Sequence, residues 1–357
     1  MKNKPIVPRL DFTRPPKIDF LKQLTTPTGI LQHTKYGIPH RSFGYSLDDN
    51  ARALLAMVQA YKLFKKKEYL SLARIYLSFI IHAKEEGGFF RNFQTFDHRF
   101  LPHVSQDSFG ETMWALAETF RNKIEPALSN TAWELFSESE KTITKIKSPR
   151  AVAYLIIALY HALKSDPGNI SFRQRLVKLT KFLLGLYEKN QDGSWNWFES
   201  VLTYANHILP AALFYSYRVL GEKKILEVAK RSLAFLEKET HADEGIPSPI
   251  GSYGWYTKGG EKAGFDQQPV EAAYAVIANV AAAQATKNKR YYRSALEWFA
   301  WFHGNNIKKV NLYDKKTGGC FDGIGKFGPN LNQGAESVAC YLLAYLELAN
   351  LASKKKH

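Results

Sequence analysis

SLDDNARALLAMVQAY, residues 46–61, begins with a polar and acidic cluster and then becomes almost wholly apolar. Five further stretches share this organisation: DSFGETMWALAETF from Asp107, SPRAVAYLIIALYHAL from Ser148, YANHILPAALFYSYRVLG from Tyr204, DQQPVEAAYAVIANVAAA from Asp266 and NQGAESVACYLLAYLELA from Asn332. A helix that is apolar on nearly every side is buried on nearly every side. The sequence therefore predicts six buried helices.

A second helix, with charged residues on one face, follows each of the first five buried segments. Examples are EYLSLARIYLSFIIHAKEE from Glu68 and EKKILEVAKRSLAFLEKE from Glu222. Regular alternation of buried and half-exposed helices is typical of helical-hairpin repeats. We therefore expect an all-α fold, the (α/α)6 toroid, with long loops at one end. Residues 19–24 are the candidate for its twelfth helix.

The first thirty residues differ in composition from the rest of the chain. They contain five prolines, at positions 5, 8, 15, 16 and 27, which favour extended structure. We expect residues 1–30 to form an extended arm and residues 31–357 to form a single toroid domain, because no linker divides them.

Composition and charge exclude several classes of protein. Of the 357 residues, 45% are hydrophobic, which is too many for a disordered chain. The 49 basic and 33 acidic residues give a net charge of +16, but the lysines lie in short scattered groups such as Lys65–Lys67 and Lys354–Lys356, so no nucleic-acid partner is expected. No secretory signal or membrane-spanning run is evident, and we expect a cytoplasmic protein without a membrane partner.

The loops before the buried helices carry the strongest functional signal. Asp192–His207 (DGSWNWFESVLTYANH) and Gly245–Pro269 (GIPSPIGSYGWYTKGGEKAGFDQQP) are rich in aromatic, glycine, amide and acidic residues. In a toroid such loops gather at one end, around the central hollow. Carboxylates beside flat rings suit carbohydrate chemistry: rings stack on sugars, one carboxylic acid protonates a glycosidic oxygen, and a second carboxylate activates water or attacks directly.

Most of these acids also have a purely structural interpretation. Ser46 with Asp49, and Ser108 with Glu111, have the spacing of a helix capping box. Asp266 fits a simple N-cap, and the loop tryptophans fit a hydrophobic core. The adjacent pair Asp48–Asp49 is harder to explain by capping, because one cap needs only one acid.

The string GYSLDDNARAL (Gly44–Leu54) resembles the G-Y-x-x-D-D-N-A-R-A-L signature of a bacterial family of (α/α)6 proteins, which occur alone or fused to GT-B glycosyltransferases. Trp195–Tyr204, Gly254–Ala272, Leu312–Ile324 and Asn330–Ser337 also fit that family. The wider resemblance is to six-hairpin glycosidases, in which acids at the ends of the inner helices cleave glycosidic bonds. The chain departs from the family after LTY, where Ala205-Asn206-His207 replaces the usual Asp-Asn-Ala.

These observations lead to the hypothesis of a glycoside hydrolase acting on an oligosaccharide, mannose- or glucose-based. One catalytic carboxylate is Asp48 or Asp49 and the other is Asp266, with Glu111 and Glu336 next in line. Substrate-binding candidates are Tyr45, Asn50, His40, Asp107, Trp197, Glu199, Asn206, Trp255, Tyr256, Gln267, Gln268, Asp322 and Asn332. This chemistry needs no metal and no organic cofactor.

Two alternatives remain open at the level of sequence. A non-catalytic glycan-binding partner of a separate glycosyltransferase is favoured by the Ala205 departure. A sugar epimerase or lyase on the same toroid would use histidines as proton shuttles, and His33, His40 and His207 lie in the loops.

Overall fold

The computed structural model describes residues 11–242 and 244–353; Pro5, Pro8 and Lys354–Lys356 lie outside them. This part of the chain contains twelve α-helices and only short strands, which confirms the predicted (α/α)6 toroid. None of the helices between residues 11 and 353 is both long and apolar enough to cross a membrane.

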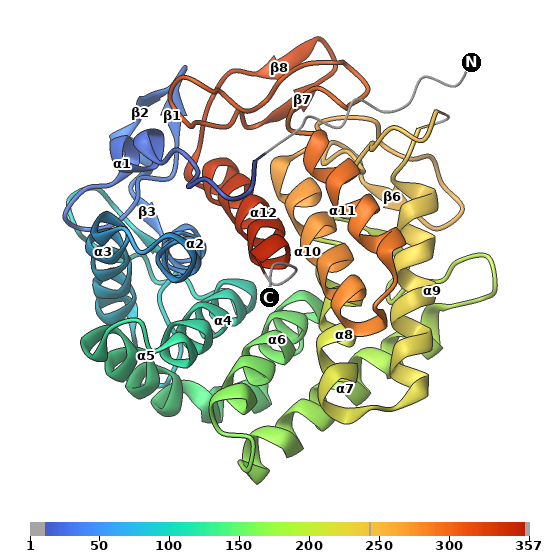
Figure 1. Cartoon of the computed structure of the whole chain (residues 1–357), viewed down its shortest axis with the longest axis horizontal. Helices are drawn as coiled ribbons and strands as arrows, with labels where there is room; N and C mark the ends of the chain where they lie inside the picture. The colour runs from blue at the N-terminus through green and yellow to red at the C-terminus, as the bar shows by residue number, and fades with distance from the viewer. Residues whose placement is uncertain (1–10, 243, 354–357) are drawn as a thin grey trace.

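Six inner helices form a closed ring (Figure 1). They are α2 (Leu47–Phe64), α4 (Gln106–Asn122), α6 (Pro149–Ser165), α8 (Ile208–Leu220), α10 (Pro269–Thr286) and α12 (Ala335–Ser353). Each packs against the next, and α12 packs against α2. As their apolar sequences predict, most of their residues are buried on every side. Gly110 allows α4 to approach α6 closely, since a Cβ there would lie 2.9 Å from the carbonyl oxygen of Ala151.

The outer layer consists of α3 (Lys67–Ala83), α5 (Pro126–Ser139), α7 (Ile170–Asn190), α9 (Lys223–Glu239) and α11 (Lys289–Ala300). Each buries one face against the inner helix before it. The short α1 (Asp19–Leu24) packs against α12 and buries Phe20, Leu21 and Leu24. The arm therefore supplies the twelfth helix, at the position that the sequence analysis singled out.

Short antiparallel strand pairs lie in the loops before the inner helices. The pairs are β1 (Thr34–Lys35) with β2 (Ile38–Pro39), β3 (Tyr45–Ser46) with β4 (Phe93–Gln94), β5 (Val201–Leu202) with β6 (Tyr256–Thr257), and β7 (Gly323–Gly325) with β8 (Gly328–Asn330). Two 3-10 helices, Arg41–Phe43 and Glu140–Lys145, precede α2 and α6. Because β3–β4 and β5–β6 each join two different loops, they hold neighbouring loops together.

The starts of the inner helices decide which acids are used in capping. Ser46 caps α2, and its Oγ accepts the N–H of Asp49 at 3.3 Å. The predicted box of Ser108 and Glu111 is wrong, because α4 begins earlier and its N-cap is Ser105. Glu111 therefore lies beyond the cap, in the second turn, where its side chain is available for tertiary contacts.

Candidate functional site

A cavity of about 390 Å³ lies at the end of the ring where the inner helices begin, here called the N-terminal mouth. Residues from α2, α4, α6, α10 and α12 and from the loops before them line it: Asp48, Arg52, Asn92, Ser105, Asp107, Ser108, Glu111, Tyr154, Tyr204, Ala205, Ser252, Trp255, Gln268, Val270 and Glu336. The predicted gathering of polar loop residues around the hollow is therefore present in the structure.

Four carboxylates surround the guanidinium of Arg52. Glu111 forms a bidentate ion pair with it, with Nε–Oε2 at 2.8 Å and Nη2–Oε1 at 3.0 Å. Arg52 Nη1 lies 3.1 Å from Glu336 and 3.3 Å from Asp49, and Nη2 lies 3.9 Å from Asp48. The phenol of Tyr274 also donates to Glu111, at 3.2 Å. One cation therefore holds four acids from three helices in a single cluster.

The crowding of acids changes their proton affinity. Burial, and next the charge of Asp48, raise the pKa of Asp49 well above its usual range, against the opposing effect of Arg52. Burial raises the pKa of Glu111 to about 7 and also raises the pKa of Glu336, again against Arg52. Carboxyl groups in such surroundings keep their protons to a higher pH than ordinary carboxyl groups and can act as acids.

Asp48 and Asp49, although adjacent, have different surroundings. Asp49 is 6% exposed, and its carboxylate accepts the Ser46 hydroxyl at 2.7 Å. The side chain of Asp48 is 29% exposed and lines the cavity, as does that of Glu336, which is 41% exposed. Asp48 and Glu336 are thus the accessible members of the cluster, whereas Asp49 and Glu111 are buried and contact Arg52.

A second buried acid supports the loop before α8. Glu271 accepts the backbone N–H of Ala205 at 2.5 Å and that of Asn206 at 3.4 Å, and burial raises its pKa to about 7. Ala205 lines the cavity with φ of 47°, a left-handed conformation that aspartate adopts more readily than alanine. Ala205, the first residue of the Ala205-Asn206-His207 stretch noted in the sequence analysis, therefore lies on the cavity wall.

Tyr204 and Trp255 provide the aromatic surface of the cavity. Their ring centroids lie 6.3 Å apart, and the Tyr204 hydroxyl donates to Asp107 at 2.5 Å. Arg150 lies 4.6 Å from the Tyr204 ring and pairs with Glu199 at 2.9 Å. Glu199 is therefore a support for Arg150 rather than part of the cavity wall.

Trp197 and Tyr256, predicted to be sugar platforms, do not line the cavity. Trp197 is fully buried, and its ring packs against Phe198 and Phe235. Because no face of the ring is accessible, it has no surface on which a sugar can stack. Tyr256 packs edge-on against Trp195 at 5.3 Å. Both belong to the packing beneath the loops.

Asp266 was predicted to be the second catalytic acid, and the structure does not place it at the cavity. It is exposed, and the N-cap of α10 is Gln268. Gln268 does line the cavity, whereas Gln267 is buried and donates to Ser248 at 2.9 Å. The direction of the chain before α10 therefore turns Gln268, and not Asp266, toward the hollow.

The remaining predicted binding residues have structural partners outside the cavity. Asn50 accepts the N–H of Ile30, Tyr45 bonds Thr26, and His40 contacts Ser42. Asp322 accepts the N–H of Gly334 and the hydroxyl of Ser337, Asn332 accepts the N–H of Tyr36, and Asn206 donates to the carbonyl of Thr203. These residues fix the loops and the start of α12, whereas the predicted residues Asp107 and Gln268 line the cavity.

Sequence reasoning missed Arg52, Tyr204 and Tyr274. A signal was present for Arg52, because it follows Asp48 and Asp49 at the i+4 and i+3 spacing that brings helical side chains together. For Tyr204 and Tyr274 the partners lie 97 and 163 residues away in sequence, so no local pattern marks them.

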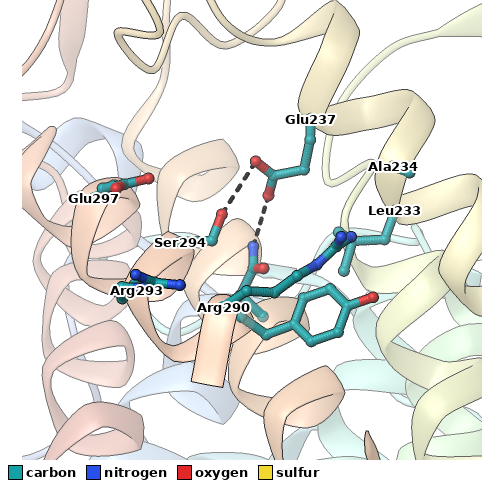
Figure 2. Close-up of a pocket in the computed structure, with 9 residues that line it drawn as sticks. Leu233, Ala234, Glu237, Arg290, Arg293, Ser294 and Glu297 are labelled. Carbon is teal, nitrogen blue, oxygen red and sulfur yellow. Dashed lines mark hydrogen bonds between the residues drawn. The ribbon is translucent and has the colours of Figure 1, made fainter. Parts of the chain in front are cut away.

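A second cavity, of about 410 Å³, lies between the outer helices α9 and α11 (Figure 2). Of its two carboxylates, Glu237 and Glu297, the first accepts hydrogen bonds from Asn279 at 2.9 Å and Ser294 at 3.1 Å. Because these contacts already satisfy Glu237 and the groove lies on the outside of the ring, the candidate site is the N-terminal mouth.

Comparison with known proteins places the chain by fold alone. No protein-family model and no curated protein sequence matches it. A sugar epimerase from a ruminal bacterium superposes with a TM-score of 0.71 at 16% identity, covering 95% of this chain and 97% of that one. The GH76 α-mannanase of Bacteroides thetaiotaomicron gives 0.67 at 12% identity, covering 95% and 94%.

A third similar structure is an inactive variant of the GH76 α-1,6-mannanase of Salegentibacter sp. HEL1_6, bound to α-1,6-mannotetrose. It gives a TM-score of 0.63 at 12% identity and covers 96% of this chain and 100% of that one. In that variant two consecutive aspartates are replaced by alanine. The chain therefore has the (α/α)6 toroid fold found in sugar epimerases and in mannanases.

Proposed function

We propose that the protein is a glycoside hydrolase that cleaves an oligosaccharide at the N-terminal mouth. The observation that carries the proposal is the cluster of four carboxylates around Arg52, three of which line a cavity with an aromatic wall; of these, Asp48 and Glu336 have partly exposed side chains. Two accessible carboxyl groups in unlike surroundings are what acid and base catalysis of glycosidic cleavage requires.

Glu336 is the proposed proton donor. Its side chain is 41% exposed, yet desolvation within the cavity still raises its pKa, against the charge of Arg52, so it keeps its proton to a higher pH than an ordinary glutamate. Asp48 is the proposed base or nucleophile. Glu111 and Asp49 are positioning residues, because they bind Arg52, and Trp255 and Tyr204 are the proposed sugar platform.

The mannanase comparison supports this assignment. That enzyme is inactive when two consecutive aspartates are replaced, and Asp48–Asp49 is the one pair of consecutive aspartates in this sequence. A mannose-linked oligosaccharide is therefore the first substrate to test.

A sugar epimerase is the second candidate, favoured by the similarity to the ruminal epimerase. The positions of the histidines weigh against a histidine shuttle, since none of the described residues that line the cavity is a histidine. His207 is fully buried against Trp298, and burial lowers its pKa to about 3. A separate glycosyltransferase as a partner and a cytoplasmic location stay predictions.

The test is product analysis on a panel of mannose- and glucose-linked oligosaccharides. We expect shortened products from the wild type and their loss in Asp48→Asn and Glu336→Gln. Glu297→Gln is the matched control, because Glu297 also has a pKa raised by burial but lies on α11, outside the ring. Full activity in both site variants would refute the hydrolase, and products of unchanged length with one inverted sugar would establish the epimerase.

A further inference from the structure

The opposite end of the ring, where the inner helices end, holds a separate cavity of about 290 Å³, here called the C-terminal mouth. Its lining comes from five inner helices and is polar: Glu118, Arg121, Tyr160, His161, Lys164, Tyr215, Arg218, Gln284, Glu347 and Asn350. Seven residues of α4 separate Glu118 from Glu111, which is about 10 Å along the axis. The two cavities are therefore distinct and share no lining residue.

The cations at this mouth have neutral partners. Arg121 donates to the Nδ1 of His161 at 2.6 Å, and Arg218 donates to the side-chain oxygen of Gln284 at 2.7 Å. Arg218 and Lys164 both lie over the ring of Tyr160, at 4.8 and 5.7 Å. These contacts leave the three positive charges in place, and the charge of Arg121 also acts on Glu118, whose pKa it lowers.

Two carboxylates, Glu118 and Glu347, also line this cavity, so its three cations exceed its acids by one. Glu118 lies 3.0 Å from the Nε2 of His161, and Glu347 accepts the amide of Gln59 at 3.1 Å. Since the Nδ1 of His161 accepts from Arg121, its proton lies on Nε2 and is donated to Glu118. This series of contacts from Arg121 through His161 to Glu118 keeps His161 neutral and fixes the position of Glu118.

Basic residues near helix C-termini offset the helix dipole, and this explains their presence in general. It does not explain a cavity into which two guanidinium groups and one ammonium group converge from three different helices. Arginine forks match phosphate oxygens, and a cavity of this size is at the small end of ligand sites.

We propose that the C-terminal mouth binds a small phosphate-bearing ligand, inorganic phosphate or a phosphate ester, through Arg121, Lys164 and Arg218. The tyrosine rings of Tyr160 and Tyr215, 4.9 Å apart, form the apolar wall against which the organic part of an ester packs. This site is independent of sugar cleavage at the other mouth.

The test is calorimetric titration of the full chain with inorganic phosphate and with mannose 6-phosphate, at constant ionic strength in chloride. We expect saturable binding at one site and weakening of about tenfold or more in Arg218→Gln. Arg290→Gln is the matched control, because Arg290 also lies over a tyrosine ring, at 4.7 Å, but on the outer helix α11. It should bind as the wild type does.

Two further variants keep the test decisive. Arg218→Lys retains the charge without the planar fork and should bind with intermediate affinity. Lys164→Gln changes an exposed side chain, so it tests the site even if the arginine variants fail to fold. Tighter binding of the ester than of phosphate would identify an ester site, and the reverse an inorganic phosphate site. Absence of saturable binding of both, or equal weakening in Arg290→Gln, would overturn the proposal.

Discussion

The two mouths of the ring use the same residue types in opposite proportions. At the N-terminal mouth four carboxylates share Arg52, and burial raises the pKa of Glu111 to about 7. At the C-terminal mouth burial has the same tendency for Glu118, but the contact with His161 and the charges of Arg121 and Lys62 outweigh it and lower the pKa of this acid. The pKa of a buried glutamate is thus raised or lowered according to the groups packed around it.

The largest expected effect is on catalysis at the N-terminal mouth. Glu336→Gln removes the proposed proton donor and should lower kcat/KM on a cleaved oligosaccharide by about 10² to 10⁴-fold. In the wild type, kcat/KM should fall toward alkaline pH as Glu336 loses its proton, because its pKa is raised. A loss of similar size in Arg218→Gln, at the other mouth, would break the distinction between the two ends.

The next effect is on stability and compares two arginines. Arg52→Gln leaves Glu111 and Asp49 buried beside one another without their cation, which should cost about 3–5 kcal/mol of unfolding free energy at pH 8. The loss should shrink at pH 5, where these carboxyls take up protons. Arg121→Gln removes one hydrogen bond to a neutral ring and one of the cations near Glu118, which keeps its contact with His161, and should cost about 1–2 kcal/mol. Denaturant unfolding at both pH values measures each, and equal losses would contradict the contrast.

A third prediction concerns the sign of the pH dependence. Glu271 has a folded-state pKa of about 7, above the value of 4.5 for an unperturbed glutamate, so its contribution destabilises the protein as pH rises from 4.5 to 7. Glu271→Gln should therefore gain up to about 3 kcal/mol relative to the wild type between pH 5 and pH 8. The contribution of Glu118, whose pKa is lowered, is present above its unfolded pKa and is lost as pH falls through the folded value.

Glu118→Gln should consequently be more destabilising at pH 6 than at pH 3. Equilibrium unfolding of both variants across this range decides the matter. The same sign for Glu271 and Glu118 would show that the two mouths do not differ in their electrostatics.

The smallest expected effect is that of Tyr204→Phe. The variant keeps the ring over Arg150 and removes only the hydroxyl bond to Asp107. We expect a loss of about 1 kcal/mol or less in stability and an increase in KM of a few-fold with little change in kcat. A large fall in kcat instead would place this hydroxyl among the reacting groups.

The architecture was predictable because a helix that is buried on all sides is apolar at nearly every position of its sequence. The segment from Ser148 is apolar at almost every position, and α6 is correspondingly buried throughout. The end of the ring that carries the candidate site was predictable for a related reason, since polar residues collect where these helices begin. Both are properties of single segments.

Which residues belong to the site was harder to predict, because this depends on the direction in which each side chain points and on contacts with residues distant in sequence. Successive helical residues point about 100° apart, so Asp48 faces the cavity while Asp49 turns toward Ser46. Trp197 and Trp255 are both loop tryptophans, but only the second lines the cavity. The bond from Ala205 to Glu271 spans 66 residues and exists only once the ring has formed.

The closure of the ring by α12 has a consequence for the order in which the chain folds. The inner face of α2 is covered by α12, and Tyr345 of α12 in turn bonds the carbonyls of Asp11 and Arg14. During synthesis α2 is complete long before α12 has been made. The apolar surface of α2 that α12 covers is therefore exposed to solvent while the intervening hairpins fold. Nascent chains that stop before Ala335 should therefore be prone to aggregation. Protection of the first hairpin against amide hydrogen exchange should appear only after the last helix has docked.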